Sequence, residues 1–279
     1  MRRRQTLSSL CVLVTSLLCM QSPVSGQEIG RPQDTTIRTA ALAAEQALDA
    51  VGRLDIGDDG FCTATLVAPA LVLTAAHCLF EGPSTVPVDI DLLTFRAGLH
   101  FGEEKARRNI RRMVVHPDYR HVGAPTRDAV AADLALLELD RALDLPTMRP
   151  LPVTGELSEG DRVELVSYAR TRAHAASRED DCNVITRGPQ ILVLTCDVDF
   201  GASGAPVFYR DPKGLGIASV VSAMTIYEGR RVALAATVEA GLDPLLAEFA
   251  RAPRMAPRAK TIKPGESASG TIRFSRPER

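Results

Sequence analysis

The sequence feature that most constrains the fold is a series of short apolar runs separated by turn residues. The first two runs, at residues 51–56 and 61–67, flank Gly57-Asp58-Asp59-Gly60, and this arrangement predicts a β-hairpin. Further runs of similar length occupy residues 71–75, 92–99, 109–116, 134–139, 163–168, 191–196, 205–209, 216–223 and 232–238. Many short strands at this spacing are typical of a sandwich or barrel, so we predict an all-β fold.

Length and composition set the limits for this fold. The chain has 279 residues, of which 45% are apolar, and this is enough to bury a sizeable core. The formal net charge of -1 gives no reason to expect nucleic acid as a partner, and we predict none.

The N-terminus has the pattern of a secretory signal peptide. Arginines at positions 2–4 precede an apolar run at residues 7–20, and small residues follow at 24–26. We therefore predict a signal peptide at residues 1–26 and a secreted or periplasmic mature protein. An uncleaved membrane anchor is the alternative, but the apolar run is shorter than the ~20 residues that a spanning helix needs, so we predict no stable membrane insertion.

Ser203 is the candidate nucleophile. Residues 200–206 read Phe-Gly-Ala-Ser-Gly-Ala-Pro, and they follow an apolar run at 191–195 that is expected to be a strand. Small neighbours leave the Ser203 hydroxyl open to a substrate. A serine hydroxyl is a poor nucleophile at its free pKa, so it needs a base and a carboxylate that orients the base.

Both groups are found upstream of Ser203. His77 follows the apolar strand 71–75, in Thr74-Ala75-Ala76-His77-Cys78. Asp133 opens the apolar segment Asp133-Leu134-Ala135-Leu136-Leu137, where an ionised carboxylate is costly unless another group pairs with it.

These three segments, in this order, resemble the catalytic motifs of the trypsin-like (chymotrypsin-fold) serine proteases. The order His, Asp, Ser differs from that of the subtilisins and the α/β-hydrolases. The resemblance implies two packed antiparallel β-barrels and a catalytic triad of His77, Asp133 and Ser203. It also implies that the backbone N–H groups of Gly201 and Ser203 form an oxyanion hole.

Two further features follow from the same resemblance. A short C-terminal helix is expected at residues 242–250. Ala202 stands where trypsin has an aspartate, and in this respect the segment resembles the bacterial branch that includes the glutamyl endopeptidases.

The cysteines favour disulfides over a metal site. Without residues 1–26, four cysteines remain, and an even count in an exported chain suggests two disulfides with three possible pairings. The family resemblance implies a Cys62–Cys78 bridge, which leaves Cys182 with Cys196. Zinc ligation is the alternative, but no CxxC or HxxxH spacing is present, and we predict no metal and no cofactor.

The flanking segments complete the predicted organisation. Residues 27–49 are a leader or possible propeptide, and residues 50–250 form the peptidase domain, with barrels at about 50–150 and 151–240. Residues 251–279 form a basic tail, for which solvation and partial disorder are favoured over attachment to an anionic cell surface.

The predicted function is an exported, monomeric serine endopeptidase that acts on proteins or peptides through an acyl-enzyme. Asp197 lies six residues before Ser203, the offset at which trypsin places the carboxylate that attracts Arg or Lys, although a turn carboxylate is the alternative. Ser222 is expected in the far wall of the substrate pocket. Two other functions stay open: a catalytically silent protease homologue that acts as a binding module, and an esterase with the same triad.

Overall fold

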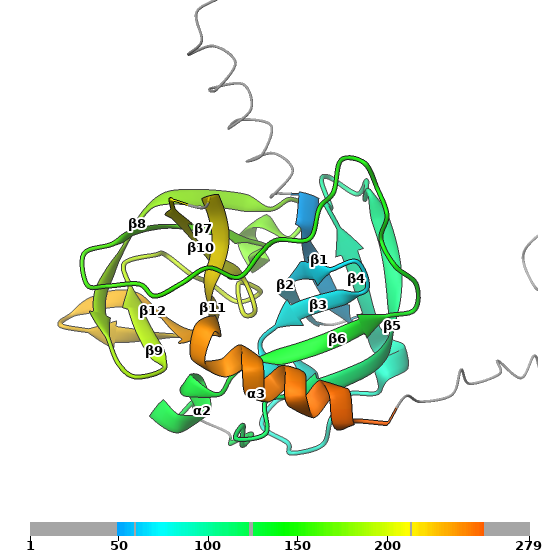
Figure 1. Cartoon of the computed structure of the whole chain (residues 1–279), viewed down its shortest axis with the longest axis horizontal. Coiled ribbons are helices and arrows are strands. Elements are labelled where there is room, and N and C mark those ends of the chain that lie inside the picture. The colour runs from blue at the N-terminus through cyan, green and yellow to red at the C-terminus, as the bar shows by residue number, and fades with distance from the viewer. Residues whose placement is uncertain (1–48, 59, 123–124, 213, 254–279) are drawn as a thin grey trace, which may run out of the picture. The chain divides into compact units, whose positions relative to one another are not determined.

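Two closed antiparallel β-barrels make up most of the molecule, as the computed structural model shows (Figure 1). The structure describes residues 49–58, 60–122, 125–212 and 214–253. The predicted all-β fold with two barrels is therefore confirmed. The predicted signal peptide, most of the leader and most of the basic tail lie outside the described residues.

The first barrel pairs its strands in the order β1-β2-β3-β6-β5-β4. Its strands are β1 (Val51–Ile56), β2 (Gly60–Ala68), β3 (Leu71–Thr74), β4 (Leu93–Ala97), β5 (Ala106–Val115) and β6 (Ala135–Leu139). The predicted hairpin is confirmed, because β1 and β2 pair in antiparallel register from Val51 opposite Thr65 to Ile56 opposite Gly60.

The second barrel pairs its strands in the order β10-β11-β12-β9-β8-β7. Its strands are β7 (Arg162–Ser167), β8 (Ser177–Arg187), β9 (Ile191–Leu194), β10 (Pro206–Asp211), β11 (Gly214–Tyr227) and β12 (Arg230–Thr237). The apolar pattern does not predict β8, because only Cys182 and Val184 of this strand are buried. Its ladders with β7 and β9 hold a mostly polar strand in place.

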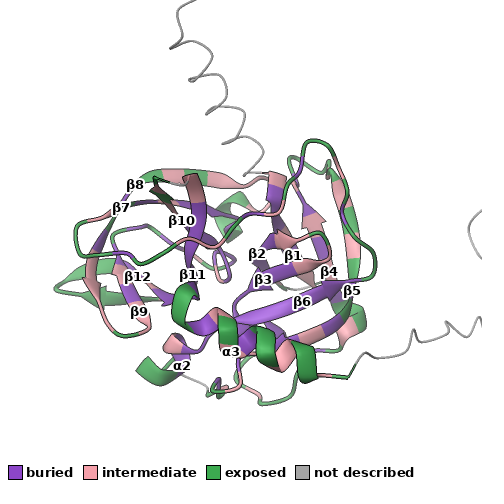
Figure 2. Cartoon of the chain, in the orientation of Figure 1, coloured by how far each residue is buried: buried purple, intermediate pink, exposed green. Residues whose placement is uncertain are grey.

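Short helices connect and close the barrels. They are the 3-10 helices η1 (Ala76–Leu79), η2 (Ile90–Leu92) and η3 (Arg170–Arg172), and the α-helices α2 (Arg127–Ala131) and α3 (Val238–Arg251). The predicted C-terminal helix at 242–250 lies within α3. Figure 2 shows buried residues concentrated in the strands, whereas α3 has a largely exposed outer side.

Arg112 of β5 fixes the end of α3 to the first barrel. Its guanidinium donates to the carbonyl oxygens of Phe249 at 3.2 Å and Ala252 at 2.9 Å, and it lies 3.6 Å from the centre of the Phe249 ring. These carbonyls have no partner inside the helix, so the arginine satisfies them from another element. No helix in the described ranges is long and apolar enough to cross a membrane.

Candidate active site

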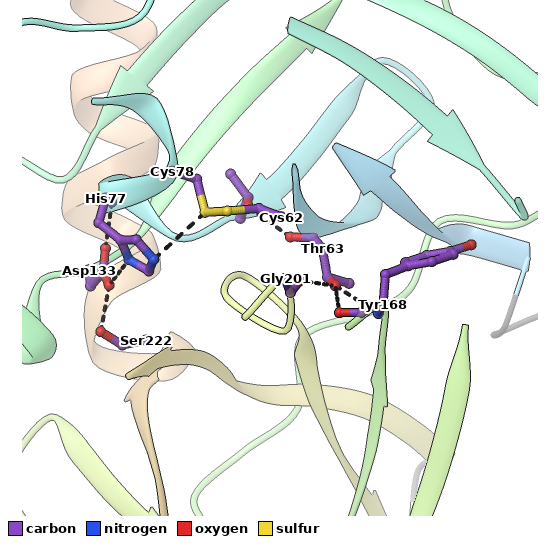
Figure 3. Close-up of a disulfide and its surroundings, with 9 residues drawn as sticks. Cys62, Thr63, His77, Cys78, Asp133, Tyr168, Gly201 and Ser222 are labelled. Atoms are coloured by element: carbon purple, nitrogen blue, oxygen red, sulfur yellow. Dashed lines mark hydrogen bonds and ion pairs between the residues drawn. A yellow bond between two sulfur atoms is a disulfide. The ribbon is translucent and has the colours of Figure 1, made fainter. Parts of the chain in front are cut away.

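His77 lies on η1, just after β3 ends. A disulfide between Cys62 of β2 and Cys78 ties η1 to the first barrel beside the imidazole (Figure 3). The second predicted bridge, Cys182–Cys196, is also present, so both pairings are confirmed. Cys62, His77 and Cys78 place possible ligand atoms within 4.8 Å of one another, but the two sulfurs are bonded to each other, and it is the thiolate that binds metal.

Asp133 precedes β6 and is 2% exposed. Its Oδ1 accepts a hydrogen bond from the backbone N–H of His77 at 2.9 Å, and its Oδ2 lies 2.6 Å from Nδ1 of the His77 ring. The hydroxyl of Ser222 donates to the same Oδ2 at 2.5 Å (Figure 3). Three hydrogen bonds therefore offset the cost of burying this carboxylate.

The contact with Asp133 changes the pKa of the His77 imidazole. Burial by itself lowers the pKa of the imidazole, but the charge of Asp133 and the hydrogen bond to it outweigh burial and raise that pKa above its ordinary value. The carboxylate also fixes the tautomer, because Nδ1 must carry the proton it donates. Nε2 is then the nitrogen free to accept a proton.

The loop that carries Ser203 is built around two glycines. Gly201 has φ +97° and Gly204 has φ +81°, backbone conformations that residues other than glycine rarely adopt. A Cβ on Gly204 would lie 2.2 Å from both the carbonyl oxygen of Thr63 and the hydroxyl of Thr74, so only glycine fits.

Thr63 of β2 binds this loop to the first barrel. Its N–H donates to the carbonyl oxygen of Ser203 at 2.8 Å, and its hydroxyl donates to that of Gly201 at 2.9 Å. The same hydroxyl accepts from the N–H of Tyr168 at 3.0 Å (Figure 3). Among the described residues, the N–H groups of Gly201 and Ser203 donate to no carbonyl oxygen, unlike that of Ala202, which donates to Asp199.

One pocket of about 520 Å³ brings the three predicted catalytic residues together. His77, Asp133 and Ser203 all line it, and they come from η1, from the start of β6 and from the loop before β10. Within the described chain, Ser203 makes no hydrogen bond to the His77 ring, whose Nε2 lies 3.9 Å from the sulfur of Cys78. Hydrogen bonds of this catalytic kind are often long without substrate and tighten with it.

A family model described as a trypsin-like peptidase domain matches residues 62–217. The chain belongs to this family. It is 34% identical over 116 residues to a trypsin of Phaedon cochleariae, an alignment that covers 40% of this chain and 41% of that protein. It is 29% identical over 187 residues to human granzyme M, covering 64% of this chain and 65% of the granzyme.

The chain thus spans less than two thirds of the length of these curated relatives. Among solved structures, a thermostable serine protease, AL20, from an extremophilic microorganism is similar with a TM-score of 0.57 and 16% identity. That match covers 73% of this chain and 99% of the other, and it shows the fold. The curated relatives are animal proteins, so they give no support to a placement in the bacterial branch.

The two predicted substrate-binding residues of this peptidase domain lie in different environments. Ser222 is one of the residues that line the pocket, and it also donates to Asp133, a contact that no local sequence pattern indicates. Asp197 is not among the lining residues. Its side chain is 83% exposed and lies 4.0 Å from Arg231, because the chain turns inward only at Val198, which is buried.

Aromatic residues of the pocket are missing from the sequence-based prediction. The rings of Phe80 and His121 stack with centroids 4.5 Å apart. The Tyr119 hydroxyl donates to Nδ1 of His121 at 2.9 Å, and Nε2 of His121 donates to the carbonyl oxygen of Gly82 at 2.8 Å. His121 has no motif around it in the sequence, so only the fold reveals that it lies beside the site.

Proposed function

We propose that this chain is an exported serine endopeptidase that uses His77, Asp133 and Ser203. One observation carries the proposal: a buried, hydrogen-bonded Asp133–His77 pair lines the same pocket as a serine on a glycine-rich loop. Membership of the trypsin-like peptidase family supports the same activity.

In the proposed reaction, Nε2 of His77 takes the proton of the Ser203 hydroxyl as the oxygen attacks the carbonyl carbon of a peptide bond. His77 then gives that proton to the leaving amine, and an acyl-enzyme on Ser203 remains. Water, activated by the same imidazole, releases the acyl group. Asp133 holds the tautomer and stabilises the imidazolium in each step.

Gly201 and Ser203 are proposed to form the oxyanion hole. Among the described residues, their backbone N–H groups donate to no carbonyl oxygen. Thr63 donates hydrogen bonds to the carbonyl oxygens of the same two residues and so fixes their peptide groups. Donors fixed before the reaction stabilise the developing negative charge without reorganisation.

The pocket walls favour an apolar side chain at the P1 position, just before the cleaved bond. Val198, Val221, Ala223 and Met224 line the pocket beside Ser203. The preference for Arg or Lys predicted from Asp197 has no support from the position of that residue. A basic preference stays the second candidate, because the acidic residue Asp199 does belong to the lining.

Export and domain organisation are part of the proposal. Two disulfides support an oxidising compartment, as expected for a chain that loses residues 1–26 on export. The domain at 50–250, the leader at 27–49, the basic tail at 251–279 and a monomeric state are proposed with it. Kinship with the bacterial glutamyl endopeptidases is proposed on one residue only. Ala202, which is 1% exposed, stands where trypsin has an aspartate.

A fluorophosphonate probe tests the proposal, because it forms a bond to an activated serine only. We expect labelling of the secreted protein at Ser203 and cleavage of peptide amides, and no labelling of Ser203→Ala. Absence of both labelling and turnover in the folded wild type would favour the silent homologue. Turnover of small esters alone would favour the esterase.

A further inference from the structure

Two phenylalanines of the pocket lining are each contacted by an arginine. Phe61 of β2 and Phe200 both line it. The Arg53 guanidinium lies 5.1 Å from the centre of the Phe61 ring, and that of Arg170 lies 4.5 Å from the centre of the Phe200 ring. We call these four residues the Phe–Arg rim.

The rim is joined to the proposed oxyanion hole. A Cβ on Gly201 would lie 2.3 Å from the Phe61 ring, so this ring packs directly on the glycine backbone. The carbonyl oxygen of Phe200 accepts from the N–H of Arg170 at 2.7 Å, and its N–H donates to Oδ1 of Asp199 at 2.8 Å. Phe200 is held by its backbone, while the residue as a whole is 61% exposed.

The two arginines differ in their partners. Arg53 is neutralised by Asp55, at 2.5 Å, and donates to the carbonyl oxygen of Ala173 at 2.9 Å. Arg170 is exposed at the start of η3, and within the described ranges its guanidinium has no ion pair. The rim therefore presents one cation whose charge is not matched by a bound carboxylate.

The strands indicate which half of a substrate meets this rim. β10 pairs with β11 only as far as Val220, yet β11 continues to Tyr227. From Ser222 onward this edge of β11 is open to an added strand, which suits the acyl half of an extended peptide. The serine loop is hydrogen-bonded to β11 and to β2, because the N–H of Gly204 donates to the carbonyl oxygen of Val221 at 2.8 Å and the N–H of Thr63 donates to that of Ser203 at 2.8 Å. β2 also carries Phe61, so a substrate whose acyl half lies along β11 extends its leaving half towards the Phe–Arg rim.

We propose that Arg170, supported by Phe200, selects substrates with an acidic side chain in the first two positions after the cleaved bond. This inference rests on the proposed endopeptidase function. A carboxylate there meets the unpaired guanidinium, and the carbon chain of a glutamate packs on the exposed Phe200 ring. The preference is modest because the contact is partly exposed to water.

Matched peptides test it. The substrates share one acyl half and differ only in Glu, Gln or Lys at the first or second position after the cleaved bond. The ratio of kcat/KM for Glu over Lys is measured in wild type, Arg170→Gln and Arg170→Glu. Arg162→Glu is the control, because Arg162 is an exposed arginine on β7 whose guanidinium lies 3.7 Å from Asp181 and belongs to neither ring contact of the rim.

We expect the wild type to favour Glu over Lys by about fivefold, the usual scale of a partly exposed ion pair. Arg170→Gln should bring this ratio near one, and Arg170→Glu should invert it, whereas Arg162→Glu leaves it unchanged. The ratio is taken within each variant, so a loss of folded protein cancels.

A p-nitroanilide with the same acyl half separates the two proposals, since it has no residue after the cleaved bond. Turnover of this compound with equal ratios in wild type and Arg170→Glu would overturn the role of Arg170 and leave the endopeptidase in place. If neither the anilide nor any peptide is cleaved by folded wild type, the endopeptidase itself is wrong.

Discussion

The two barrels contribute to the site in different ways. The first supplies His77 and Asp133, which are bonded to each other and lie beside a disulfide. The second supplies Ser203 and Gly201 on a loop, together with pocket walls that include Val221, Ala223 and the exposed Phe200. The first barrel thus provides the proposed proton-transfer groups and part of the wall, including Phe61 and Phe80, and the second provides the proposed nucleophile and the rest of the wall.

The proton-transfer groups and the wall residues should respond differently to substitution. Groups that move a proton act on every substrate, so their loss should lower kcat by a similar factor for all peptides. Groups in the walls meet only particular side chains, so their loss should change the order of preferred peptides. Ser222 links the two, because it is a wall residue from β11 that donates to Asp133.

The largest effect is expected from Asp133→Asn. An asparagine cannot hold Nδ1 of His77 in the same tautomer, and we expect kcat to fall by about 10⁴-fold for every substrate. The residual activity should also change with pH. Without the carboxylate the raised pKa of His77 falls, so the acid limb of kcat/KM moves to lower pH.

Asp128→Asn in α2 is the matched control for this variant, since Asp128 is exposed and does not line the pocket. The ion pair between Asp133 and His77 also predicts an effect of pH on the stability of the fold. A raised folded-state pKa stabilises the fold below the pKa of His77 in the unfolded chain, and this contribution is lost as pH rises through the raised value. If the factor by which Asp133→Asn lowers kcat differs widely between peptides, the proposed division between proton-transfer groups and wall residues is wrong.

The next effect is expected at the contact between the barrels. Gly201→Ala places a Cβ 2.3 Å from the Phe61 ring at φ +97°, and we expect the free energy of unfolding to fall by about 2 to 4 kcal/mol. Urea denaturation measures this loss. Gly57→Ala is the control for backbone strain alone, because it has φ +60° with nothing within 4 Å of the added carbon.

Phe61→Ala sharpens this prediction. The three atoms nearest to the added carbon belong to the Phe61 ring, so the double variant should be more stable than the sum of the two single changes predicts. Strictly additive losses would show that the clash is not with this ring.

The smallest effect is expected from the two acidic residues before Phe200. Asp199→Asn removes a carboxylate that lines the pocket, and we expect relative cleavage after Lys, compared with Leu, to fall by about threefold. Asp197→Asn, whose side chain is 83% exposed, should leave this ratio unchanged. A larger response to Asp197→Asn would restore the trypsin-like pocket predicted from sequence spacing.

The sequence predicts most of the fold because its apolar runs coincide with strands, as β1 and β6 show. It does not predict β8, which is held by ladders with two neighbours and buries few side chains. The family motifs indicate the proposed triad and the Cys62–Cys78 bridge, and this bridge leaves Cys182 to pair with Cys196. The contact of Ser222 with Asp133, the exposure of Asp197 and the approach of His121 depend on loop paths, which the local pattern does not encode.

The buried hydroxyl of Thr63 in β2 donates to the carbonyl oxygen of Gly201, which lies 138 residues later in the chain, and so holds the backbone of the serine loop. During synthesis His77 and Asp133 are made well before the loop that carries Ser203, and β11 is made after that loop. A chain released before the serine loop is made would lack the proposed nucleophile and could form no acyl-enzyme.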